Sequence, residues 1–144
     1  MRSTRRRPEH LRALGPRGLA EKRGPRLVSA NAPAEARSTA VEVMAQIRPD
    51  GYAKAVSMLA LADTRADVAR LRPTMRVQFI HGDADEITPP ESVHAIAAER
   101  PDAPAHVIPG AGHAVYLERP AAFNALMRSF LAGRQPYGVR QGWR

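Results

Sequence analysis

Residues 76–91 read RVQFIHGDADEITPPE, and this stretch decides the fold that we predict. Its first half is apolar and β-prone, through Val77, Phe79 and Ile80, and the apolar run stops before Gly82, which predicts a short buried strand over 76–81. Acidic residues follow at once. We therefore expect a carboxylate just beyond the end of a strand.

The second half of the stretch predicts the start of a helix. Thr88 would be its N-cap, Pro89 its first residue and Glu91 its third, which is the pattern of a capping box. A second apolar run, over 105–108, precedes the glycine-rich turn PGAGH, whose last residue is His113. Strand, helix and strand then form a right-handed βαβ unit, so both strand-end loops should lie at the same edge of the sheet, where ligands bind in open α/β folds.

These motifs together resemble the C-terminal part of an α/β-hydrolase. They are GxxDxxxP over 82–89, GAGH over 110–113 and ERPxxFN over 118–124. In that family the catalytic serine, acid and histidine follow one another along the chain, with the acid and the histidine on loops after the last strands. The resemblance implies that Asp85 is the triad acid and His113 the base. It implies no catalytic role for Glu118.

The preceding segment adds to the resemblance. The stretches RPDGY over 48–52 and LAxAD over 59–63 resemble the helical cap and return segment of small α/β-hydrolases that include 3-oxoadipate enol-lactone hydrolases and related esterases. Apolar spacing predicts a helix over 33–48, a second over 52–62, a short third one capped by Asp63, and a last helix that opens at Pro120 and stops at Gly133.

The expected fold class is therefore α/β, a truncated α/β-hydrolase fold with the last two parallel strands, flanking helices and the remnant of a helical cap. We expect a basic disordered leader over 1–17 and cap-derived helices over 18–72. The C-terminal part of the hydrolase core would occupy 73–133, and a tail 134–144.

The serine that this triad requires is not found at a suitable position. A nucleophile of this family stands on a turn of the form Gly-x-Ser-x-Gly, and no serine or aspartate of the chain stands between such glycines. We therefore expect the chain to be the C-terminal part of a serine-type hydrolase that acts on ester or lactone-like bonds of small molecules. Because it lacks the nucleophile, we expect it to be inactive alone. The alternative is a non-catalytic remnant or binding module of the same fold.

Other readings of the acidic loop fit less well. Asp83 competes with Asp85, but the family acid falls three residues after the glycine, so we interpret Asp83 as a turn or solvent-facing carboxylate. Asp83 and Asp85 also resemble the pair of magnesium-binding aspartates in haloacid-dehalogenase-like phosphatases. That motif has threonine or valine two residues after the second aspartate, where this chain has Ile87. Zinc and calcium sites need a further ligand or another spacing. We expect no metal and no cofactor.

Composition limits the class of protein. The chain has 144 residues, 44% hydrophobic and 25% charged, as in ordinary globular domains, and no cysteine. This composition excludes disulfides and a thiolate nucleophile, and it suits a reducing cytoplasm. No apolar run is long enough to span a bilayer, so we expect no membrane association.

The net charge of +8 comes mostly from residues 1–26. A basic arm could contact phosphates or serve as a targeting segment. We interpret it as a solvated leader, because Pro8, Pro16 and Pro25 interrupt any long helix and no aromatic residue lies among the arginines. Nucleic acid is therefore not an expected partner. The expected partners are a small-molecule substrate in the complete enzyme, and an N-terminal half or a second copy that covers the open sheet edge.

Overall fold

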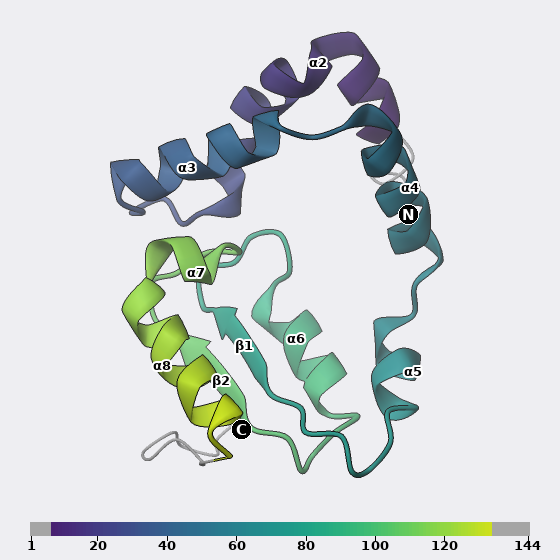
Figure 1. The fold of residues 1–144 in the computed structure, drawn as a ribbon, viewed down its shortest axis with the longest axis vertical. Helices are drawn as coiled ribbons and strands as arrows, with labels where there is room; N and C mark the ends of the chain where they lie inside the picture. The colour runs from purple at the N-terminus through teal and green to yellow at the C-terminus, as the bar shows by residue number, and fades with distance from the viewer. Residues whose placement is uncertain (1–6, 134–144) are drawn as a thin grey trace.

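A parallel pair of strands forms the sheet of the computed structural model, which describes residues 7–133. Strand β1 (Phe79–Gly82) pairs with β2 (Ala105–Ile108), with Phe79 opposite Ala105. Helix α6 (Pro90–Ala97) connects them, and α7 (Val115–Glu118) and α8 (Pro120–Leu131) follow. Figure 1 shows the sheet lying between α6 and α8. The predicted parallel βαβ unit and the α/β fold class are confirmed.

One apolar core joins the sheet to the last helices. Ile108, Ala111 and Val115 are buried, and half-buried side chains of β1 and α8 pack against them, namely Ile80, Phe123 and Leu126. The apolar stripe predicted for the last helix thus faces the strands. Gly133 follows α8 with φ of 71°, a left-handed conformation that suits glycine after a helix, as predicted.

The predicted start of α6 is wrong by one residue. Pro89 is the N-cap, with φ of −57° and ψ of 150°, Pro90 is the first helical residue, and no side chain caps the helix. A proline disfavours the helical conformation of the residue before it, so Pro90 keeps Pro89 extended. The capping box from Thr88 to Glu91 is therefore absent. Strand β1 also begins later than predicted, at Phe79.

Within residues 7–78, five helical segments precede the sheet. They are α2 (Arg7–Arg23), the 3₁₀ helix η1 (Gly24–Leu27), α3 (Ala34–Ala45), α4 (Pro49–Leu61) and α5 (Thr64–Ala69). Asp63 caps α5 by accepting a hydrogen bond from the backbone N–H of Ala66 at 3.1 Å, as predicted. Helix α4 begins at Pro49 and not at Tyr52, because proline at the first position already has helical φ and needs no hydrogen bond there.

Helix α2 includes residues 7–17, which we expected to be part of a disordered leader. Its backbone is not helical at Gly15, which has φ of 65° and ψ of 174° and precedes Pro16, so two helical stretches meet at a kink there. Leu11, Leu19 and Ala20 are buried, and α2 packs against α3 and α4. Burial of these side chains explains why a basic segment is ordered here. The predicted tail over 134–144 lies outside the described residues, as do residues 1–6.

The helices that precede the sheet contact the α/β unit through α3 and, separately, through α5. Figure 1 shows α3 beside α7, and α5 beside α6 on the opposite side. At the second contact Arg65 of α5 donates a hydrogen bond from Nε to Glu99 at 2.9 Å, just after α6. Within residues 7–133, no helix combines the length and apolar character that a membrane crossing requires.

A buried histidine of β2 predicts that the fold loses stability in mild acid. His106 is 2% exposed, and neither of its ring nitrogens has a hydrogen-bond partner within residues 7–133. Burial lowers the pKa of His106 below its ordinary value of 6.5. The folded chain then binds fewer protons than the unfolded chain, so stability present above about pH 6.5 falls as the pH falls through that value.

We expect thermal unfolding midpoints of the parent chain to drop between about pH 7.5 and about pH 5, and the drop to be smaller in His106→Leu. His10→Leu changes an exposed histidine of α2 and serves as the control. An equal drop in His106→Leu and the parent would contradict the prediction.

Candidate active site

Asp85 lies just beyond the end of β1, with one carboxylate oxygen fixed by the backbone. Its Oδ1 accepts hydrogen bonds from the N–H groups of Ile87 at 2.8 Å and Thr88 at 2.9 Å. The residue is 7% exposed. These bonds make a local turn and hold the carboxylate plane, so that Oδ2 is directed to a second partner.

That partner is His113, on the loop after β2. Its Nδ1 lies 2.9 Å from Oδ2 of Asp85, and its side chain is 41% exposed. The predicted meeting of these two side chains at one edge of the sheet is confirmed. An ionised carboxylate accepts hydrogen bonds only, so the neutral imidazole carries its proton on Nδ1 and offers Nε2 as a proton acceptor.

The two strand-end loops are joined to each other by hydrogen bonds. Asp83 is exposed and its Oδ1 accepts a hydrogen bond from the N–H of Gly110 at 2.7 Å, and Ala84 donates to the carbonyl of Ala111 at 3.0 Å. Asp83 therefore braces the histidine loop, while Asp85 is the carboxylate that meets the imidazole. The rigid pairing of the loops limits how far His113 can move from Asp85.

Sequence reasoning missed two buried residues behind the histidine loop. Glu118 of α7 is 4% exposed and Ser29, which follows η1, is 5% exposed. Glu118 accepts hydrogen bonds from Ser29 and from Gly112, the residue before His113. No local pattern indicates the bonds between Ser29 and Glu118, which lie 89 residues apart along the chain.

His81 and His94 form a separate pair on β1 and α6. Their ring centroids are 5.8 Å apart in an edge-to-face arrangement. Burial lowers the pKa of His94, and the neighbouring His81 lowers it further. Buried His81 and half-buried His94 fit the packing of α6 on the sheet.

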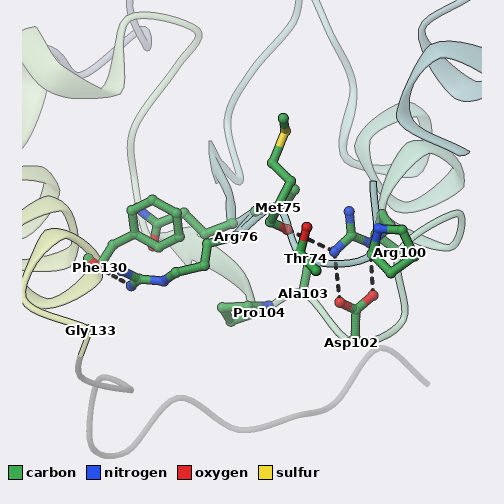
Figure 2. A pocket seen from close by; sticks show the side chains of 12 residues that line it. Thr74, Met75, Arg76, Arg100, Asp102, Ala103, Pro104, Phe130 and Gly133 are labelled. Atoms are coloured by element: carbon green, nitrogen blue, oxygen red, sulfur yellow. Dashed lines mark hydrogen bonds and ion pairs between the residues drawn. The ribbon is translucent and has the colours of Figure 1, made fainter. Parts of the chain in front are cut away.

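A pocket of about 200 Å³ lies at the other end of the strands, around the residues that lead into β1 and β2. Figure 2 shows Arg100 bonded to Asp102 and to the carbonyl of Met75, and Arg76 stacked on the Phe130 ring. The ion pair lowers the pKa of Asp102 to about 2. Ligands of open α/β sheets bind at the carboxyl ends of strands, so Asp85 and His113 mark the better candidate site.

Comparison with known proteins gives a family. The sequence matches the model of the alpha/beta hydrolase family over residues 1–126. A search of curated proteins finds no match.

Solved structures match over most of this chain. A thermophilic esterase from Thermogutta terrifontis, with malate bound, has a TM-score of 0.77 and 29% identity over 92% of this chain and 49% of its own. Two others show the fold alone. They are a bromoperoxidase from Bacillus anthracis (TM-score 0.75, 18% identity, 90% of this chain and 48% of that one) and an esterase from Exiguobacterium antarcticum (0.71, 15%, 87% and 48%). The chain spans about half the length of these structures.

Proposed function

The chain belongs to the alpha/beta hydrolase family, and on that premise we propose that it supplies the acid and the base of a serine-type ester hydrolase. The proposal makes this chain the C-terminal portion of the catalytic unit. The nucleophilic serine would come from a polypeptide segment outside these 144 residues. That segment would also add a strand to the open edge of β1.

The contact between Asp85 and His113 carries the proposal. One carboxylate oxygen is occupied by two backbone N–H groups, and the other lies 2.9 Å from Nδ1 of the imidazole. A buried carboxylate held in this way orients the ring and stabilises the imidazolium that forms when Nε2 takes a proton. A histidine that only packed against the loop would not need this arrangement.

The proposed chemistry is acyl transfer through the serine. His113 Nε2 takes the hydroxyl proton as the serine oxygen attacks the ester carbonyl carbon, and the protonated imidazole then gives that proton to the departing alcohol. Water attacks the resulting acyl-serine in the same manner, its proton passing through His113 to the serine oxygen as the acid leaves. Asp85 remains ionised throughout and stabilises the positive ring.

We propose esters or lactone-like bonds of small molecules as substrates. The 29% identity to the Thermogutta esterase supports ester cleavage. The resemblance of residues 48–52 and 59–63 to a cap and its return segment supports a substrate pocket covered by α3, α4 and α5, of the kind found in enol-lactone hydrolases. Caps shape the pocket, so these helices would select the substrate.

A chimera tests the proposal. The half of the Thermogutta esterase that this chain does not match is fused ahead of it, and hydrolysis of p-nitrophenyl acetate is followed at 405 nm, the usual wavelength for p-nitrophenolate, at about pH 8. We expect turnover by the chimera and none by the chain alone. His113→Ala should return the chimera to background, whereas His10→Ala should leave its rate unchanged.

Two outcomes would contradict the proposal. Turnover by the chain alone that disappears in His113→Ala would place a nucleophile within these residues. A folded chimera that is inactive, or whose rate does not depend on His113, would remove the acid and base roles from this chain.

A further inference from the structure

The buried carboxylate of Glu118 joins two segments that are far apart along the chain. Its Oε1 accepts hydrogen bonds from the backbone N–H of Ser29 at 3.0 Å and of Gly112 at 2.6 Å, and its Oε2 accepts one from the Ser29 hydroxyl at 2.6 Å. We call these three bonds the Glu118 latch. A buried charge is costly unless it is hydrogen-bonded, and here both oxygens are satisfied.

The latch acts on the residues that flank His113. Gly112 precedes His113 and is held by Glu118, while Ala114 follows His113 and donates a hydrogen bond to the carbonyl of Leu27 at 2.7 Å. The imidazole therefore stands between two backbone groups that are both tied to the segment 27–29. Val28, Ala40 and Ala114 form a buried apolar cluster beside these bonds.

Glycine at 112 is required for this close approach. A Cβ at this position would lie 2.6 Å from the Ser29 nitrogen and 2.7 Å from the Val28 carbonyl carbon, closer than real Cβ atoms come to other atoms. The segment 27–29 and the histidine loop thus pack backbone against backbone. While the bonds of the Glu118 latch are formed, the histidine loop has little room to move.

We propose that Glu118 and Ser29 are positioning residues for His113, which hold its loop at the place where Nδ1 meets Asp85. The inference rests on the proposed function for its catalytic meaning, because it makes the latch part of the machinery that presents Nε2. It also gives the segment 27–29, which links η1 to α3, a role at the site. Removing the hydrogen bonds of the Glu118 latch should allow the imidazole to move away from Asp85 while the sheet stays folded.

The tautomer of His113 reports the state of the latch and needs no turnover. In the parent chain at about pH 8, nitrogen-15 correlation spectra should show the imidazole proton on Nδ1, held by Asp85. In Glu118→Ala the ring is released, and the proton should move in part to Nε2, the form that neutral imidazole side chains favour in water. Amide exchange of Gly112 should accelerate by about a hundredfold.

Smaller changes separate the latch from a general loss of stability. Ser29→Ala removes one donor and should accelerate exchange at Gly112 by about tenfold, with Ser57→Ala, an exposed serine of α4, as its control. Glu118→Gln keeps one oxygen for the two N–H groups and an amide that can donate to the Ser29 oxygen. It should therefore keep the parent tautomer.

Clear results would overturn the inference. One is a Ser29→Ala chain whose Gly112 exchange and His113 tautomer match the parent, and this variant decides the question if Glu118→Ala does not fold. Another is a Glu118→Gln chain that behaves like a folded Glu118→Ala chain, because the bonds would then not be what holds the loop. Failure of the chimera to hydrolyse ester is a separate outcome, since these readouts are spectroscopic.

Discussion

Gly82→Ala is expected to cost this chain a large part of its stability. Gly82 is the last residue of β1 and is buried, and a Cβ there would lie 2.0 Å from the carbonyl oxygen of Ala111 and 2.6 Å from that of Gly112. Both are backbone atoms of the histidine loop, so rotating a side chain cannot relieve the clash. The strand and the loop would have to separate, at a cost of about 3 kcal/mol or more.

The total stability of a small domain is about 5–15 kcal/mol, so this loss should be visible in any unfolding experiment. We expect the thermal midpoint, followed by circular dichroism at about 222 nm, to fall by about 10 °C or the chain to be unfolded at 25 °C, the usual reference temperature. Gly82 does not have positive φ, so the effect is steric.

Gly51→Ala is the matched control for this prediction. Gly51 lies in the first turn of α4, and a Cβ there would meet nothing within 4 Å. Alanine should stabilise that helix by about 1 kcal/mol, because it loses less backbone entropy on folding. If Gly82→Ala and Gly51→Ala unfolded at similar temperatures, the close packing of β1 on the histidine loop would be refuted.

The strands and the loops at their ends could be predicted from sequence, because their signals are local. Phe79 and Ile80 give a local apolar signal, Gly82 ends it, and the handedness of a βαβ unit then leaves one arrangement for the two strands. Asp85 and His113 therefore meet at 2.9 Å although many residues separate them. The handedness rule for βαβ units therefore predicted that Asp85 and His113 lie close together, although no local pattern links them.

Other features depend on contacts that no rule of this kind supplies. The bonds of Glu118 to Ser29 require α7 and the segment after η1 to lie side by side, which nothing in either segment indicates. Order in α2 likewise comes from the burial of Leu19 against other helices, whereas its own composition favours a solvated leader. Tertiary packing overrode the local preference in both places.

Asp85→Asn is expected to lower ester hydrolysis by the chimera about 10⁴-fold while leaving the fold intact. The side-chain oxygen of asparagine can still accept the N–H groups of Ile87 and Thr88, as Oδ1 does now. Its amide nitrogen must then take the place of Oδ2, opposite Nδ1 of His113. A group that accepts a hydrogen bond is thereby replaced by one that donates.

The exchange of an acceptor for a donor decides the tautomer of His113. With an amide N–H facing Nδ1, the ring must accept there and carry its proton on Nε2, so Nε2 can no longer take a proton from a serine hydroxyl. Nitrogen-15 spectra of Asp85→Asn at about pH 8 should show this reversal in the chain alone, with an unfolding midpoint close to that of the parent. Asp83→Asn is the matched control, because Asp83 bonds Gly110 and not the imidazole. Two results would contradict the prediction: a proton that stays on Nδ1 of His113 in Asp85→Asn, or an equal loss of turnover in Asp83→Asn. Either result would mean that Asp85 does not set the tautomer of His113. The proposed acid–base pair at this edge of the sheet would then have no chemical basis.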